Sequence, residues 1–240
     1  MKAFLVDDER LARSELKRLL SAHPDIICVG EARNVQEAER QLRSLPVDLL
    51  FLDIRMPGAD GFELLEKLDT VPGVIFTTAF DEYAVRAFEV NALDYLLKPI
   101  EPERLAAALE RARKQQAAVP ASAQRSAAAG SSLDRVFVRE GERCWIVRLH
   151  DIRLFESVGN YTRVFFGSNR PLVLKSLGTM EERIDPAMFF RASRSHIFNL
   201  QFVERLETEV DGSYIIHLRG GPRVSSSRRQ SRKLREMLSL

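Results

Sequence analysis

Five polar side chains in the first half of the chain have the types and spacing that phosphoryl transfer needs. They are Asp7, Asp8, Asp53, Thr78 and Lys98. Each follows a short apolar run, as Asp53 follows the apolar residues 49–52. Such an uninterrupted run is typical of a strand buried on both faces, and ligands of open α/β sheets bind at the carboxyl ends of their strands. The five side chains are therefore predicted to meet at one edge of a sheet.

The chemistry expected at this edge is the formation of an aspartyl phosphate. Three converging carboxylates repel one another unless a cation joins them, and Mg²⁺ is the small, hard cation that oxygen ligands favour. In that setting Asp53 is the nucleophile, while Mg²⁺ and Lys98 offset charge on the phosphoryl oxygens and Thr78 donates a hydrogen bond to one of them. A single Asp after a strand is most often a turn or capping residue. The interpretation rests on the whole set at successive strand ends.

The elements that must position these residues alternate between strand and helix patterns. Strands are predicted at residues 3–6, 26–30, 49–52, 74–77 and 95–97. Helical spacing of apolar residues follows each of them, with helices over about 61–68, 81–90 and 102–116 among them. Five such repeats indicate an α/β fold with a doubly wound, five-stranded parallel sheet.

Four motifs give this half of the chain a resemblance to a known family. They are Asp7-Asp8-Glu9, Leu52-Asp53-Ile54-Arg55-Met56-Pro57-Gly58, Thr78-Ala79-Phe80 and Asp94-Tyr95-Leu96-Leu97-Lys98-Pro99. Residues 1–116 thereby resemble the receiver domain of two-component response regulators. The resemblance implies that Asp53 accepts a phosphoryl group from a sensor histidine kinase, and that the Lys98-Pro99 peptide bond is cis. It further implies Mg²⁺ binding by Asp8 and Asp53, aided by Asp7, and a switch formed by Thr78 and Tyr95.

The composition changes after the last predicted helix. Residues 117–132 are rich in Ala and Ser and poor in large apolar side chains, which predicts a flexible linker. Beyond them, short β-rich runs are separated by turn signals such as Asp211-Gly212. The predicted organisation is a receiver domain at 1–116, the linker at 117–132, and a mainly β domain with short helices at 133–240.

Charge is divided unequally between the two halves. Residues 1–116 carry 16 Lys and Arg against 21 Asp and Glu, whereas residues 117–240 carry 20 against 13. A basic half is a candidate for contact with a polyanion. Arg228, Arg232 and Arg235 would share one face of a final helix, either for phosphate contact or simply as a solvated surface. Asn199 and Arg194 carry groups that can pair with adenine or guanine edges.

Two motifs give the second half its own resemblance. They are Phe190-Arg191-Ala192-Ser193-Arg194-Ser195-His196-Ile197-Phe198-Asn199 and Val224-Ser225-Ser226-Ser227-Arg228-Arg229. Residues 134–238 thereby resemble LytTR-type DNA-binding domains. The resemblance implies that loops, not a recognition helix, read the DNA. It places Asn199 and an arginine of the Arg228-Arg229 pair among the contacts, with a further contact near Thr162 and Arg163.

We interpret the sequence as a phosphorylation-controlled transcription regulator of a two-component system. Its expected partners are a sensor histidine kinase, double-stranded promoter DNA and a second copy of the chain, which dimerises on activation through the helix at 81–90 and the strand and helix after it. No segment approaches the roughly 18 apolar residues of a membrane span, and the amino terminus does not resemble a signal peptide, so a cytoplasmic location with no membrane partner is expected.

Two other functions stay open at this point. The acidic edge could belong to an enzyme, an aspartate-nucleophile phosphotransferase or phosphatase. Such phosphatases usually carry a second acid two residues after the nucleophile, and here that residue is Arg55, which argues against an enzyme. The basic half could instead bind an acidic protein or RNA. An affinity for duplex DNA that falls steeply with salt and prefers one promoter sequence would distinguish DNA binding from binding to an acidic protein or to RNA.

Overall fold

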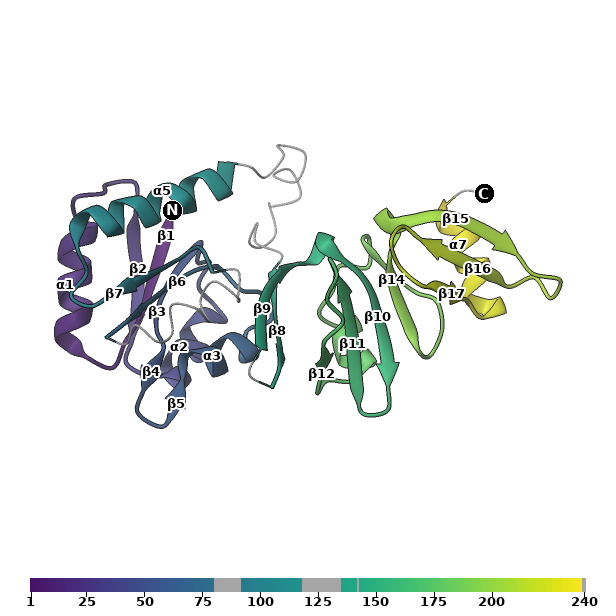
Figure 1. Cartoon of the computed structure of the whole chain (residues 1–240), viewed down its shortest axis with the longest axis horizontal. Helices are drawn as coiled ribbons and strands as arrows, with labels where there is room; N and C mark the ends of the chain where they lie inside the picture. Colours follow the sequence, from purple (N-terminus) through teal and green to yellow (C-terminus); the bar gives the residue numbers. More distant parts are fainter. Residues whose placement is uncertain (80–91, 118–134, 142, 239–240) are drawn as a thin grey trace. The chain divides into compact units, whose positions relative to one another are not determined.

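The structure is a computed structural model that describes residues 1–79, 92–117, 135–141 and 143–238. It forms two compact units, one of Met1–Phe137 with Gly141–Ile146 and one of Val138–Glu140 with Val147–Leu240 (Figure 1). The division falls inside a β-hairpin. The boundaries at 1–116, 117–132 and 133–240 stay a prediction, and residues 118–132 of the predicted linker lie outside the described residues.

The first unit is built on the parallel sheet that the sequence predicts. Its strands are β1 (Lys2–Val6), β2 (Ile27–Ala32), β3 (Leu49–Asp53), β6 (Gly73–Thr78) and β7 (Asp94–Leu97). They lie in the order β2-β1-β3-β6-β7, and every neighbouring pair is parallel. The predicted five-stranded, doubly wound fold is confirmed.

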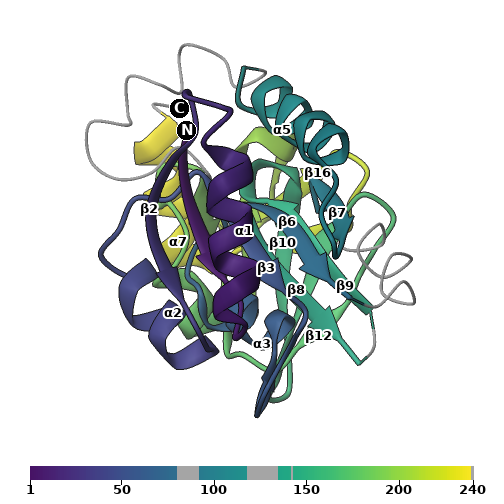
Figure 2. The same cartoon turned by 90° about the vertical axis from the view of Figure 1, so that its left-hand side faces the viewer.

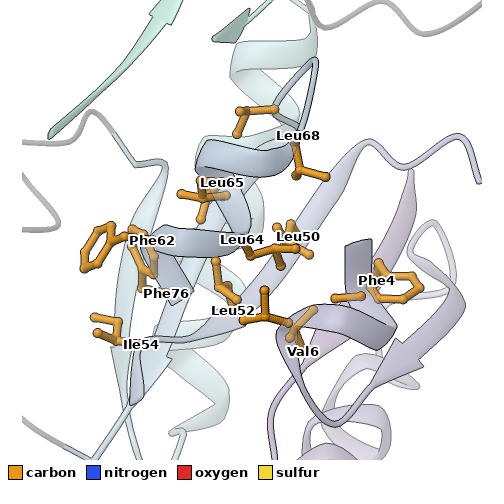
Figure 3. Packing of buried hydrophobic residues seen from close by; sticks show 14 of the residues in the cluster. Phe4, Val6, Leu50, Leu52, Ile54, Phe62, Leu64, Leu65, Leu68 and Phe76 are labelled. Atoms are coloured by element: carbon orange, nitrogen blue, oxygen red, sulfur yellow. The ribbon is translucent and has the colours of Figure 1, made fainter. Parts of the chain in front are cut away.

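Alternation along the strands sends apolar side chains to two faces, and helices cover both (Figure 2). The helices are α1 (Arg10–Leu20), α2 (Val35–Leu42), α3 (Gly61–Lys67) and α5 (Pro102–Ala117). Leu5 and Phe51 lie in the cluster that α1 and α5 complete. Phe4 and Leu52 lie in the opposite cluster, which α2 and α3 cover (Figure 3). The predicted helix at 81–90 lies outside the described residues.

The chain immediately after Asp53 has regular structure. Two short strands, β4 (Arg55–Met56) and β5 (Ala59–Asp60), form a small hairpin around Gly58, whose φ is +83°. Asp60 then caps α3, forming a capping box with Glu63. A Cβ on Gly61 would lie 2.4 Å from the Asp53 carbonyl oxygen, so glycine lets α3 begin directly beside the end of β3.

The second half of the chain is mainly β, as predicted. Its strands are β8 (Arg135–Glu140), β9 (Arg143–Arg148), β10 (Ile152–Val158), β11 (Tyr161–Phe166), β12 (Leu172–Val173), β13 (Phe189–Arg191), β14 (His196–Asn199), β15 (Val203–Thr208), β16 (Tyr214–Leu218) and β17 (Arg223–Ser225), and its α-helices are α6 (Leu177–Glu181) and α7 (Arg228–Leu238). β8 pairs with β9; the other strands form a five-stranded sheet, β12-β11-β10-β14-β13, and a three-stranded sheet, β15-β16-β17.

One apolar cluster joins these last two sheets and α7. It contains Leu154 and Phe198 of the five-stranded sheet, Ile216 of the three-stranded sheet and Leu234 of α7, all essentially inaccessible to solvent. The sequence did not predict β14 or β17. Among the helices in the described part of the chain, none has the length and apolar character of a membrane span.

Candidate functional site

The predicted acidic edge is present and already contains a positive charge. One carboxylate oxygen from each of Asp7, Asp8 and Asp53 lies within 4.8 Å of the others. Lys98 Nζ lies 2.8 Å from Asp7 Oδ2 and 2.7 Å from Asp53 Oδ2. Thr78, fully buried at the end of β6, accepts the Lys98 backbone N–H at 2.8 Å through its carbonyl oxygen. The structure therefore brings all five predicted residues to one edge.

Backbone groups fix the two buried acids. Asp7 Oδ1 accepts the Glu9 N–H at 2.9 Å, and Asp53 Oδ1 accepts the Arg55 N–H at 3.1 Å. These bonds leave Asp7 Oδ2 and Asp53 Oδ2 directed to Lys98. The acidic edge is thus held in place before any ion or phosphoryl group arrives.

Arg13 of α1 supports the acidic loop, a role that no pattern in the sequence indicates. Its Nη1 donates to the carbonyl oxygen of Asp7 at 2.6 Å and to that of Asp8 at 3.3 Å, while its Nε pairs with Glu31 at 2.9 Å. The contacts join α1, β2 and the loop after β1. An arginine on a polar helix face has no local pattern that predicts such a tertiary contact.

The pKa shifts in the pocket reflect burial and the close approach of Lys98 to the carboxylates. Burial raises the pKa of the Asp53 carboxyl; Lys98 opposes this shift, and the neighbouring Asp7 carboxylate adds to it. Burial alone would lower the pKa of Lys98, but its hydrogen bonds to Asp53 and Asp7 outweigh burial and raise it. The oxygen donors of Asp7, Asp8 and Asp53, all within 4.8 Å of one another, form a group that could hold a small, hard cation.

Of the two residues of the predicted switch, Thr78 lies at the acidic edge and Tyr95 lies in an apolar cluster of the receiver. Tyr95 of β7 is 7% exposed and pairs in register with Phe76 of β6, two residues before Thr78. Both aromatic side chains belong to the apolar cluster that α3 covers. The Lys98-Pro99 peptide bond is cis, which confirms the expectation from the family resemblance.

In the second unit, three stretches far apart in sequence meet at one place. The Ser227 N–H, at the start of α7, donates to Ala192 O at 2.9 Å, and the Ser157 N–H of β10 donates to Ser195 O at 2.8 Å. The turn between β13 and β14 therefore lies beside both α7 and β10. Exposed basic residues at this junction are Arg194 in the turn and Arg228 and Arg229 at the start of α7. This surface is the candidate nucleic-acid interface.

Two predicted DNA-contact residues have structural partners instead of exposed polar groups. Asn199 is fully buried; its Nδ2 donates to Ile152 O at 3.0 Å, and its Oδ1 accepts the Gln201 N–H at 2.9 Å. Thr162 is also fully buried, and its hydroxyl donates to Lys175 O at 2.7 Å. Both side chains therefore form hydrogen bonds within the fold, and their contact with DNA stays a prediction.

Two further predicted contacts, Arg163 and Arg228, are partly exposed and ion-paired. Arg163 Nη1 lies 2.8 Å from Glu156 Oε2. Glu156 of β10 lies between its two cross-strand partners, Arg163 of β11 and His196 of β14. Arg228 Nε lies 3.2 Å from Asp211 Oδ2, with 74% of the Arg228 side chain exposed. Exposed pairs of this kind contribute only about 0–1 kcal/mol, so either arginine can exchange its carboxylate for a phosphate.

Comparison with known proteins assigns the two parts of the chain to two different domain families. Residues 3–110 match the response regulator receiver domain, and residues 142–239 match the LytTr DNA-binding domain. The chain is 33% identical to the sensory transduction protein LytT of Enterococcus faecalis and 31% identical to LytT of Bacillus subtilis. It is 35% identical to the transcriptional regulatory protein BtsR of Salmonella typhi. Each alignment covers the whole of both chains.

The fold, the acidic pocket and these matches define a response regulator with a receiver domain and a DNA-binding domain. More particularly, the chain belongs to the LytT-type family of response regulators, in which a receiver domain is joined to a LytTR DNA-binding domain.

Proposed function

We propose that phosphorylation of Asp53 by a sensor histidine kinase controls how this regulator binds promoter DNA. The observation that carries the proposal is the pocket in which Lys98 Nζ lies 2.7 Å from Asp53 Oδ2, among three carboxylates that suit a divalent cation. A nucleophile, an ammonium and a cation site are together what transfer of a phosphoryl group to a carboxylate requires.

In the proposed reaction, a carboxylate oxygen of Asp53 forms a bond to the phosphorus of a phosphohistidine. The phosphorus–nitrogen bond breaks, and its electron pair returns to the imidazole. Mg²⁺, held by Asp7, Asp8 and Asp53, supplies neutralising charge at the phosphoryl oxygens when it is bound. Lys98 contributes a second positive charge, and the Thr78 hydroxyl donates to a phosphoryl oxygen once that oxygen is present.

The proposed switch follows from the position of Thr78 and Tyr95. A phosphoryl oxygen that accepts from Thr78 draws the end of β6 toward Asp53, and Tyr95 pairs with β6 next to that end. Tyr95 therefore changes its packing in the cluster behind the pocket. A switch of this kind is a shift between two discrete arrangements of a packed core.

The proposed DNA interface is the junction of the β13–β14 turn with α7. Arg194, Arg228 and Arg229 supply the positive charge there, with Arg163 on β11, which pairs with β10 in the same sheet. Because arginine can donate two parallel hydrogen bonds to a phosphate or to a guanine edge, these residues can both position and read a duplex. We propose that Asn199 and Thr162 stabilise the strands around these arginines through their buried hydrogen bonds.

We also propose that activation favours a homodimer. The described part of the predicted dimer face contains β7 and α5, where the buried Asp94 carboxylate pairs with Arg111 Nη1 at 2.5 Å and Arg104 Nη2 at 3.5 Å. Size-exclusion chromatography with light scattering, with and without beryllofluoride, tests this mechanism. If DNA affinity rises while the protein stays monomeric, dimerisation is not the mechanism.

The proposed activity is that of a cytoplasmic regulator, not of an enzyme that turns over small substrates. Arg55 occupies the position where an aspartate-nucleophile phosphatase needs a second acid, and its backbone N–H instead donates to Asp53. A protein- or RNA-binding function for the basic unit is a less favoured alternative. It would be supported if promoter and scrambled duplexes bound equally well at every salt concentration.

Intact-mass analysis after incubation with acetyl phosphate and Mg²⁺ tests the acceptor directly. We expect one added phosphoryl group on the wild type, none on Asp53→Asn, and none on the wild type when EDTA removes the metal. An unmodified wild type, or equal labelling of Asp53→Asn, would refute Asp53 as the acceptor.

A further inference from the structure

The β8–β9 hairpin packs on the receiver unit, although the DNA-binding family match includes one of its two strands. The DNA-binding family match begins at residue 142 and so contains all of β9. Yet Cys144 and Ile146 of β9, at 7% and 5% exposure, are buried in the same apolar cluster as Phe62 and Phe76 of the receiver. Residues 141–146 accordingly form part of the first compact unit.

Strand β8 adds two specific contacts within that unit. The ring of Phe137 stacks on that of Phe62, with centroids 6.3 Å apart and an interplanar angle of 25°. The carbonyl oxygen of Arg135 accepts the N–H of Val71, in the loop after α3, at 2.9 Å. Aromatic stacking and a backbone hydrogen bond are directional, so the hairpin is held in one position on this surface.

The surface under the hairpin lies directly behind the phosphoacceptor. Phe62 follows Gly61, whose N–H donates at 2.8 Å to the carbonyl oxygen of Ile54, the residue after Asp53. The Phe62 ring lies 5.0 Å from Phe76, and Figure 3 shows these two side chains next to each other, with Ile54 nearby. Ile54, Phe62 and Phe76 share their cluster with Tyr95.

We propose that this hairpin is the receiver's intramolecular partner in the unphosphorylated state and that phosphorylation of Asp53 releases it. The inference rests on the proposed function of Asp53. Well-packed apolar contacts do not deform continuously, so movement of Tyr95 within the cluster weakens the fit of the hairpin. Val138–Glu140 and the chain from Val147 onward belong to the second unit, so the released hairpin stays joined along the chain to the DNA-binding unit.

Cys144 provides a probe of this docking that does not depend on DNA. Among the cysteines, Cys28 is exposed and Cys144 is buried, so a Cys28→Ser background leaves one thiol that reports on the hairpin. The rate at which Ellman's reagent modifies Cys144 follows the population in which the hairpin is open. Fluorine NMR of bound beryllofluoride reports separately on occupation of the acceptor site.

With Mg²⁺ and beryllofluoride, we expect the modification rate of Cys144 to rise by about tenfold or more, as a ligand-driven population shift would produce. Asp53→Asn in the same background should show neither bound beryllofluoride nor faster modification. Bound beryllofluoride with an unchanged Cys144 rate would overturn the release of the hairpin and leave the acceptor function standing. Absence of bound beryllofluoride from the wild-type acceptor would overturn both.

A variant pair tests the docking contact itself. Phe137→Ala removes the stack on Phe62 and should raise the Cys144 rate without beryllofluoride, whereas Val136→Ala, on the opposite face of the same strand, should leave the rate unchanged. Retained beryllofluoride binding verifies that the receiver of each variant is folded. A Cys144 rate in folded Phe137→Ala that equals the wild-type rate would contradict the docking.

Discussion

Replacement of Asn199 by alanine should separate a structural role from a DNA contact. The residue lies in a motif that resembles a DNA-binding signature, yet its side chain is fully buried and its amide is bonded on both sides. We therefore predict that Asn199→Ala unfolds the DNA-binding unit more readily and lowers DNA binding only through the loss of folded protein.

The size of the effect follows from the two bonds. Removal of the Nδ2 donor leaves the fully buried carbonyl of Ile152 without this partner, at a cost of about 1–3 kcal/mol. Loss of the Oδ1 bond to the Gln201 N–H removes the cap of the short helix Leu200–Phe202, at a cost of about 0.5–2 kcal/mol. A combined loss of roughly 2–4 kcal/mol lowers the Tm of a unit of this size by on the order of 10–20 °C.

Thermal unfolding of the full chain, followed by circular dichroism, measures this shift beside the matched variant Arg194→Ala. Arg194 lies five residues earlier and is exposed, so its removal should leave the Tm within a few degrees of the wild-type value while weakening DNA binding by about 1–3 kcal/mol. A variant Asn199→Ala with wild-type Tm and reduced affinity would refute the structural role and support direct contact.

Three further results are expected. Arg229→Ala should weaken binding to all duplexes alike and reduce the slope of log affinity against log salt by about 1 in anisotropy titrations; an unchanged slope would remove Arg229 from the phosphate contacts. Lys98→Ala should slow phosphorylation by acetyl phosphate by roughly 10²–10³-fold in an intact-mass time course, since it removes one of the charges beside Asp53; wild-type kinetics would contradict this. Gly61→Ala should lower the free energy of unfolding by about 1–3 kcal/mol, because the new Cβ would lie 2.4 Å from the Asp53 carbonyl oxygen; denaturant titration measures it, and an unchanged midpoint would show that α3 shifts at no cost.

The receiver fold was predictable because its local patterns agree with its tertiary structure. The apolar run 49–52 is typical of a central strand of a parallel sheet, and β3 occupies that place. Asn34, a residue type that favours helix N-caps, precedes α2, and its side chain accepts the Glu37 N–H at 2.8 Å. The acidic edge followed from topology alone, because all parallel strands end on the same side.

Residues whose roles depend on contacts distant in sequence could not be predicted. Arg13 reaches the acidic loop from α1, and no spacing along the helix indicates it. The strand β14 was read as a recognition motif, which hid the alternation that buries Asn199. Cys144 and Ile146 look like ordinary strand residues of the second half, and only packing shows that they complete the cluster around Phe62 and Phe76.

Occupancy of the chromosome by the wild type and by Asp53→Asn, mapped by genome-wide footprinting under conditions that activate the cognate kinase, shows whether the acidic pocket governs DNA binding. We predict that the wild type occupies a set of promoters that Asp53→Asn, expressed at the same level, leaves largely free. Identical footprints for the two proteins would contradict control of the DNA-binding unit by phosphorylation of Asp53.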